Sequence, residues 1–128
     1  MSKWGDGFRD VWEKMEWAAI ATSGDGQPHV IGAWGKDLRT LSPSLDDTIV
    51  VPTGGMRVTE QNLTRNSKVE VLLASREVQG TRKPGQGCSL TGTGEVQTSG
   101  RYAELAKSRF PWARGALVIR IESAKLHL

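Results

Sequence analysis

Apolar positions recur along the chain with two different periods. Near the N-terminus, Phe8, Val11, Trp12 and Met15 follow the i, i+3, i+4, i+7 spacing of an amphipathic helix with one buried face. Elsewhere the apolar positions alternate with polar ones or form short runs, which is typical of strands. The segments with this strand-like pattern are residues 17–23, 28–34, 48–52, 67–75, 88–98 and 115–128.

The segments between these runs predict turns, loops and two further helices. The sequence GDG at 24–26 predicts a hairpin turn, because glycine and aspartate adopt positive φ at low cost. Residues 57–66 and 99–110 are polar with apolar positions on one side, and each predicts a short helix. Residues 37–42 are expected to form a short edge strand, and residues 78–87, rich in glycine and proline, a loop.

Two glycines interrupt the strand predicted at 88–98. Gly92 and Gly94 indicate a bend or bulge there. The predicted strands follow one another mainly as hairpins rather than as β-α-β units, which favours an antiparallel barrel with helical additions. Residues 1–128 contain no repeat or linker, so one domain is expected.

Length and apolar content limit the possible locations of the protein. With 128 residues and 38% hydrophobic residues, the chain resembles a soluble globular domain. No apolar run approaches the roughly 20 residues needed to cross a bilayer, and the N-terminus lacks the pattern of a signal peptide. We expect a cytoplasmic protein without a membrane partner.

Few side chains are suited to metal binding or nucleophilic catalysis. Cys88 is the single cysteine, so no internal disulfide can form, and its small, glycine-rich neighbourhood favours a buried strand residue over a nucleophile. With only His29 and His127 besides, a structural metal site is not expected. No catalytic set emerges, so any reaction is expected to depend on a cofactor.

The charge balance is mildly basic, with a net charge of +3 and a pI of about 9.3. Basic residues are scattered among 14 acidic ones, and the densest basic group, at Arg82 and Lys83, has no interleaved aromatic residue. A nucleic-acid partner is therefore not expected. A small phosphorylated ligand agrees with the same balance.

The sequence PTGGMRVT at 52–59 offers several groups to an anion. Gly54 and Gly55 expose backbone at a strand end, and the helix that follows presents free amide groups there. Arg57 adds a cation and Thr59 a hydroxyl, which would together hold a phosphate, although Thr59 and Glu60 would also suit a plain helix cap. The spacing alone favours neither the phosphate site nor the capped turn.

Aromatic side chains provide candidate walls for a flat ligand. Trp12 and Trp17 fit core positions, whereas Trp34 follows the small residues Gly32 and Ala33. Trp112 precedes the last strand. For each tryptophan a place in the core is the simpler interpretation.

Several stretches resemble one known family. They are WAAIATSGDGQPHV, IVVPTGGMRVTEQNLTRNSKVEVLLASREVQG, GTGEVQTSG and FPWARGALVIRIESAKLHL, in that order between residues 17 and 128. The chain resembles the FMN-binding split-barrel proteins related to pyridoxamine 5′-phosphate oxidase, and the small bacterial FMN-binding proteins among them. The pattern after the Gly-Gly-Met turn carries much of the specificity: Asn62, Arg65, Asn66, Lys68 and Val69.

The resemblance implies a fold, a cofactor and a set of site residues. It implies a mainly β protein with short helices, built as a six-stranded antiparallel split β-barrel that forms a homodimer with FMN at the interface. Pro52–Gly55 would lie along the isoalloxazine ring, with Trp34 and Trp112 beside it, Thr59 on the phosphate and Leu128 reaching the partner's flavin. The cofactor-binding residues so implied are Gly32, Ala33, Trp34, Pro52, Thr53, Gly54, Gly55, Arg57, Thr59, Trp112 and Leu128.

Two positions depart from the family pattern. Val58 stands where the family usually has a lysine before the phosphate-binding threonine, and Gly32 and Ala33 replace polar strand residues. Arg57 or Arg39 would have to supply the missing charge, and we favour Arg57.

Two functions remain open on this basis. The first is a small FMN-dependent redox protein, an electron carrier or flavin reductase served by a partner protein or a nicotinamide donor. The second is a non-enzymatic dimeric barrel whose FMN binding is weakened or lost.

Overall fold

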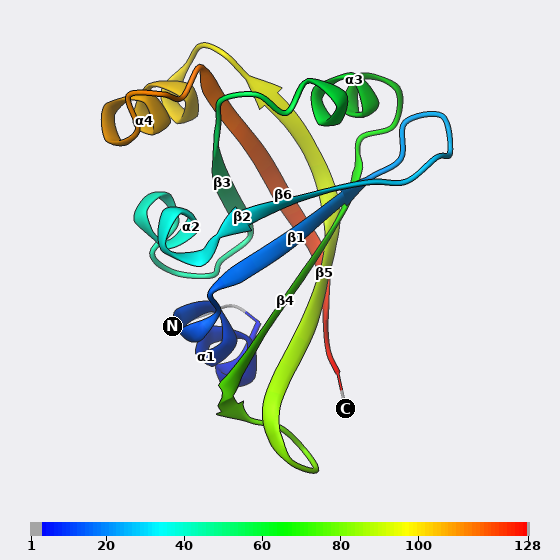
Figure 1. The fold of residues 1–128 in the computed structure, drawn as a ribbon, viewed down its shortest axis with the longest axis vertical. Coiled ribbons are helices and arrows are strands. Elements are labelled where there is room, and N and C mark those ends of the chain that lie inside the picture. Colours follow the sequence, from blue (N-terminus) through cyan, green and yellow to red (C-terminus); the bar gives the residue numbers. More distant parts are fainter. Residues whose placement is uncertain (1–3, 128) are drawn as a thin grey trace.

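The computed structural model describes residues 4–127 as one strongly curved antiparallel sheet with helices around it (Figure 1). The helices are α1 (Asp6–Lys14), α2 (Gly35–Leu41), α3 (Arg57–Arg65) and α4 (Arg101–Arg109). The strands are β1 (Trp17–Thr22), β2 (His29–Trp34), β3 (Thr48–Thr53), β4 (Lys68–Gln79), β5 (Pro84–Gln97) and β6 (Gly115–Leu126).

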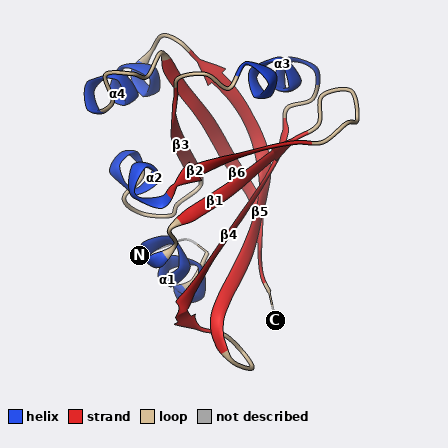
Figure 2. Ribbon diagram, in the orientation of Figure 1, coloured by secondary structure: helices blue, strands red, loops and turns tan. Residues whose placement is uncertain are grey.

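The six strands are hydrogen-bonded in the order β2-β1-β4-β5-β6-β3, and every pairing is antiparallel. The sheet curls into a half-barrel whose edges are β2 and β3, with the helices arranged around it (Figure 2). This confirms the predicted mainly β, six-stranded split-barrel class. In the part of the chain that is described, no helix has the length and apolar character to cross a membrane.

Local sequence explains the irregular points of the sheet. The register of β5 against β6 shifts between Thr91 and Gly92, as the glycine pattern predicted. A Cβ at Gly92 would lie 2.0 Å from the carbonyl oxygen of Arg120, so only glycine fits this close approach. Pro52, which cannot donate a backbone hydrogen bond, lies in the edge strand β3, where one side of the strand needs no partner.

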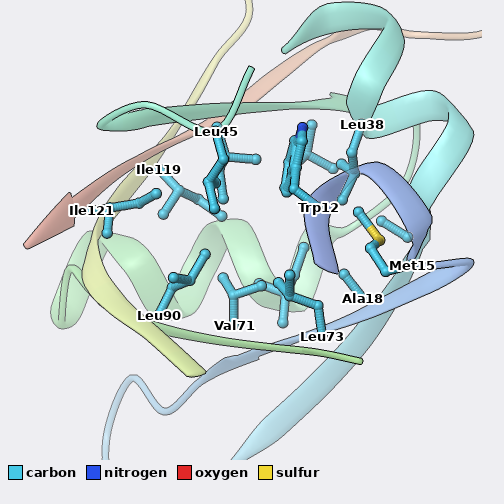
Figure 3. Close-up of a cluster of buried hydrophobic side chains, with 14 of the residues drawn as sticks. Trp12, Met15, Ala18, Leu38, Leu45, Val71, Leu73, Leu90, Ile119 and Ile121 are labelled. Carbon is cyan, nitrogen blue, oxygen red and sulfur yellow. The ribbon is translucent and has the colours of Figure 1, made fainter. Parts of the chain in front are cut away.

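The main core fills the concave side of the sheet beneath α1 and α2. Trp12 stands at its centre, with Leu38 and Leu45 beside it and Val71 and Leu73 below (Figure 3). Its indole Nε1 donates to the carbonyl oxygen of Ser42 at 3.0 Å, so the ring is buried without losing its hydrogen bond. This ties α1 to the segment between α2 and β3.

The prediction of an edge strand at 37–42 is wrong, because Gly35–Leu41 forms α2. Leu38 and Leu41 are three residues apart and both buried, which places them on one helical face. Arg39 Nη1 donates to the carbonyl oxygens of Trp12 (2.9 Å) and Met15 (2.8 Å) near the end of α1. The expected three helices thus become four within residues 4–127.

Two other expectations also need correction. Most of the loop predicted at 78–87 is strand, because β4 continues to Gln79 and β5 begins at Pro84. Trp17 is not a core residue, since 46% of its surface is exposed on the outer face of β1. Strand alternation decides this, because Ala18 and Ile20 take the inward positions.

The helical character of α2 can be tested by substitution. We expect Leu38→Ala and Leu41→Ala each to lower the free energy of unfolding by roughly 2–5 kcal/mol, because both side chains leave a buried helical face. Lys36→Ala, at an exposed position, should change it by less than about 0.5 kcal/mol. Denaturant unfolding of the three variants measures this. A strand would put Leu38 and Leu41 on opposite faces, so a neutral Leu41→Ala would contradict the helix.

Candidate functional site

A cavity of about 350 Å³ lies between the edge strands β2 and β3, a size suited to a small organic ligand. It brings together parts of the chain that are up to 80 residues apart. Its lining residues are Gly32, Ala33, Trp34, Asp37, Val51, Pro52, Gly54, Gly55, Met56 and Trp112. Seven of these are predicted site residues, whereas Asp37, Val51 and Met56 were not predicted.

The two tryptophans of the cavity are unusually exposed for their size. Trp34 and Trp112 each keep 56% of their surface accessible. Trp34 packs edge-on against Trp17 with ring centroids 4.5 Å apart, and Trp112 contacts Phe110 at 5.4 Å. Each indole is thus held from one side by another ring and offers aromatic surface to a ligand.

Gly32 is required by packing rather than by a ligand. A Cβ at this position would lie 1.5 Å from the Trp17 ring, so that indole lies directly over the bare backbone of β2. The replacement of a polar residue by glycine is therefore coupled to the position of Trp17.

The surroundings of Gly54 and Gly55 give a different reason for each of these glycines. A Cβ at Gly54 would approach the Trp112 ring to 3.1 Å, whereas one at Gly55 would meet no atom within 4 Å. Neither glycine has a positive φ; the left-handed residue of the turn is Met56, with φ 60°. Gly55 therefore leaves space beside the backbone, as the sequence predicted.

Arg114 is the main residue that sequence reasoning missed. Its Nε donates to the carbonyl oxygen of Gly54 at 2.6 Å. Its Nη2 donates to the carbonyl oxygen of Gly55 at 2.8 Å and to Glu60 Oε1 at 2.7 Å. Its backbone N–H bonds the carbonyl oxygen of Thr53 at 2.9 Å. An arginine before an apolar strand gave no signal of these contacts, which depend on the pairing of β3 with β6.

The N-terminus of α3 is left without a side-chain cap. Thr59, one of the candidate caps, makes no such bond: its side chain is completely buried, and its Oγ1 has no hydrogen-bond partner among residues 4–127. The backbone N–H groups of Arg57, Val58 and Thr59 likewise find no acceptor in the described structure. Free donors and the helix dipole make this end of α3 suited to an anion.

The two candidate replacements for the missing lysine lie in different places. Arg57 lies at the start of α3 with 71% of its side chain exposed and only a 3.7 Å contact to Glu60, so it is free to approach a ligand. Arg39 is bonded to backbone carbonyls at the end of α1 and does not line the cavity. The alternative that named Arg39 has no support from this arrangement.

Two further predicted residues remain, of which Thr53 does not line the cavity. Thr53 is buried behind it, and its hydroxyl donates to the carbonyl oxygen of Val51 at 3.1 Å. Leu128 lies outside the described residues.

Polar side chains of α3 and the residue after it join the helix to the β1–β2 turn. Asn62 Nδ2 donates to Thr22 Oγ1 at 3.1 Å, and Asn66 Nδ2 donates to Ser23 Oγ at 3.1 Å. Arg65 pairs with an aspartate of the same turn. The motif Asn62, Arg65 and Asn66 therefore positions α3 rather than contacting the cavity.

Other features of the described residues offer less to a ligand. A hollow of about 660 Å³ follows the β4–β5 hairpin and one of about 420 Å³ lies against β1, β4 and β5, but among residues 4–127 neither is lined by a buried side-chain polar atom that lacks a partner. Burial raises the pKa of Cys88 to about 12, so its thiol is protonated at neutral pH and a poor nucleophile. Within residues 4–127, no three His, Cys, Asp or Glu side chains are grouped to hold a metal.

Comparison with known proteins gives a family match over nearly the whole chain. The family model described as pyridoxamine 5′-phosphate oxidase matches residues 5–127. The chain is 41% identical over 118 residues to a protein of Nitratidesulfovibrio vulgaris (strain Miyazaki F) named FMN-binding protein, which covers 92% of this chain and 93% of that one.

Solved structures share the fold at lower identity. A variant of HupZ from Group A Streptococcus has a TM-score of 0.76 and 24% identity, covering 97% of this chain and 99% of that chain. An FMN-binding protein from Syntrophomonas wolfei has a TM-score of 0.60 and 18% identity, covering 94% and 83%. At these identities the two structures support the fold alone.

The unpaired hydroxyl of Thr59 predicts an unusual stability effect. Thr59→Val should raise the free energy of unfolding of the ligand-free protein by about 1 kcal/mol, because it removes a buried hydroxyl that has no partner in the described part of the chain. Thr59→Ser, which keeps the hydroxyl, should not. Urea unfolding of the ligand-free proteins measures this, and a loss of stability in Thr59→Val would show that the hydroxyl has a partner.

Proposed function

This chain belongs to the pyridoxamine 5′-phosphate oxidase family, and on that premise we propose that it binds FMN non-covalently as a small redox protein. The observation that carries the proposal combines two neighbouring features. The cavity has exposed indoles and bare glycine backbone, and the adjacent N-terminus of α3 has donors that are unpaired within residues 4–127. The naming of a 41% identical relative as an FMN-binding protein supports the choice of FMN.

The cavity fits the flat ring of a flavin. Pro52 and Gly54–Gly55 form one wall, and the absence of any atom near a Cβ at Gly55 leaves room for a planar group against the backbone. Trp34 and Trp112 offer aromatic surface on two sides, where ring stacking would add to the burial of apolar area.

The N-terminus of α3 fits the phosphate. A phosphate there would accept from the free N–H groups of the first turn and from the buried hydroxyl of Thr59, for which residues 4–127 provide no other partner. Arg57 would add a positive charge from the surface, in place of the lysine that Val58 replaces. Because Arg57 is exposed, salt screens its contribution more than it would that of a buried cation.

In this mechanism the protein binds and orients, and the cofactor reacts. FMN, when bound, supplies the capacity to take up and pass on electrons. Trp34 and Trp112 would fix the plane of the ring, and the Gly54–Gly55 turn would supply backbone donors at its edge. This division of roles suits an electron carrier or a flavin reductase, with electrons supplied by a redox protein or a nicotinamide.

We also propose that the protein is a homodimer. An apolar face on the outer side of the sheet, formed by Trp17, Val30, Trp34 and Leu72, is exposed in the single chain. Trp34 belongs both to this apolar face and to the lining of the cavity, so a second copy bound to the face would also cover the cavity. The large aromatic residues of this face are typical of the centres of protein interfaces.

The second candidate is a dimeric barrel that binds a ligand without redox turnover. Val58 favours it, because a chain that has lost the cation next to Thr59 would bind a phosphate less tightly. The two candidates differ in one property: a redox protein carries a flavin that is reduced and reoxidised.

Flavin binding provides the direct test of the proposal. We expect the purified protein to be yellow, to bleach with dithionite and to quench the fluorescence of added FMN. Thr59→Val should weaken FMN binding by about tenfold or more, since a hydrogen bond to a charged group is lost. Arg57→Ala should weaken it by several-fold.

Riboflavin, which lacks the phosphate, is the matched control ligand. Its affinity should be unchanged by Thr59→Val and Arg57→Ala. A colourless protein that leaves FMN fluorescence unquenched would favour the non-redox barrel. An Arg57→Ala variant that binds FMN within twofold of wild type would remove Arg57 from the phosphate site.

The dimer can be tested at an exposed position of the apolar face. Leu72→Lys should shift the protein from dimer to monomer in sedimentation velocity, because a charge would be buried against the second copy. Leu72→Met keeps an apolar side chain and should stay dimeric. A wild-type protein that sediments as a monomer at micromolar concentration would refute the dimer.

A further inference from the structure

Arg114 is a charged residue beside the cavity, yet it does not line it. Only 21% of its side chain is exposed, and its guanidinium is bonded to two consecutive carbonyl oxygens, those of Gly54 and Gly55, and to Glu60. Because Glu60 neutralises it and its Nε and Nη2 are occupied, Arg114 is poorly placed to serve as a phosphate cation. Its contacts instead fix the backbone of the turn.

The peptide geometry of the turn gives these contacts a consequence for the cavity. All peptide bonds of the described chain are trans, so each N–H points opposite to the carbonyl of the same peptide unit. With the carbonyls of Gly54 and Gly55 held by Arg114, the N–H groups of Gly55 and Met56 point away from the guanidinium. Both residues line the cavity, and neither N–H has an acceptor among the described residues.

We infer that Arg114 is a positioning residue that orients the N–H groups of Gly55 and Met56 toward the flavin ring. This rests on the proposed function, since the ring is the group that would accept these bonds. Two successive backbone N–H groups form a small region of positive potential. Such donors stabilise the added negative charge of a reduced flavin more than the neutral oxidised ring, so they raise its potential.

The inference separates the roles of two arginines that share one carboxylate. Arg57 and Arg114 both contact Glu60 Oε1, at 3.7 Å and 2.7 Å. Arg57 is exposed at the α3 N-terminus and is proposed to act on the phosphate. Arg114 lies behind the Gly54–Gly55 turn and affects the flavin ring through the backbone that it holds. Their removal should therefore have different effects on FMN and riboflavin.

The test compares Arg114→Gln with the matched variant Arg57→Gln. We expect Arg114→Gln to weaken FMN and riboflavin binding by similar factors, and to weaken the reduced flavin about tenfold more than the oxidised one. That differential corresponds to a midpoint potential about 30 mV more negative for a two-electron couple. Arg57→Gln should weaken FMN alone and leave the potential of bound riboflavin unchanged.

A second measurement does not depend on the flavin. In the ligand-free protein, NMR order parameters of the Gly55 and Met56 amides should fall in Arg114→Gln and stay unchanged in Arg57→Gln. Thermal melting verifies that the variants are folded, and Arg114→Lys, which cannot bond both carbonyls and Glu60 in the same way, replaces Arg114→Gln if that variant does not fold.

The outcomes distinguish this inference from the proposed function. If wild-type protein binds neither flavin, the proposed function fails, and the order parameters alone decide whether Arg114 positions the turn. If wild type binds flavin but the Arg114 variant keeps wild-type affinities, potential and order parameters, the inference is wrong and the proposed function stands. A loss of FMN affinity without loss of riboflavin affinity would also overturn it, because Arg114 would then act on the phosphate.

Discussion

The candidate site depends on the register of β3 against β6. Thr53 pairs with Gly115, so the turn that follows β3 lies beside the segment that precedes β6, about sixty residues later in the chain. This pairing places Trp112 against Gly54 and Arg114 against the carbonyls of the turn. A shift of one residue would reverse the faces of β3 and separate these groups. Residues 49–53 of β3 and their partners, residues 115–119 of β6, are all buried, so a shift would displace packed side chains in both strands.

The parts of the fold that sequence predicted are those where local pattern and packing agree. The alternation of β4 and the helical spacing of Phe8, Val11 and Trp12 reflect burial directly, and the structure keeps both. The helix α2 was missed because its two buried leucines are too few to outweigh a segment that also resembles a strand. Trp17 was misplaced because large apolar side chains usually lie inside, whereas here one covers the glycine of a neighbouring strand.

The same limit applies to the site. The Gly-Gly turn and the two flanking tryptophans carry a local signal, since bare backbone next to aromatic residues suits a flat ligand. Arg114 carries none, because its partners become neighbours only through strand pairing. Thr59 was a candidate both for capping the helix and for binding a phosphate, and its buried hydroxyl makes no hydrogen bond within residues 4–127. Contacts between distant segments therefore decide which polar groups are used by the fold and which remain available.

The contacts between α3 and the β1–β2 turn connect the candidate phosphate site to the hairpin that carries Trp34. Asn62 and Asn66 bond to Thr22 and Ser23, at the tip of the hairpin whose second strand ends at Trp34. These bonds attach the helix at one end of the hairpin, and the Trp34 indole stands at the opposite end of β2. The donors at the start of α3 and the aromatic wall of the cavity are therefore both carried by elements anchored to one hairpin.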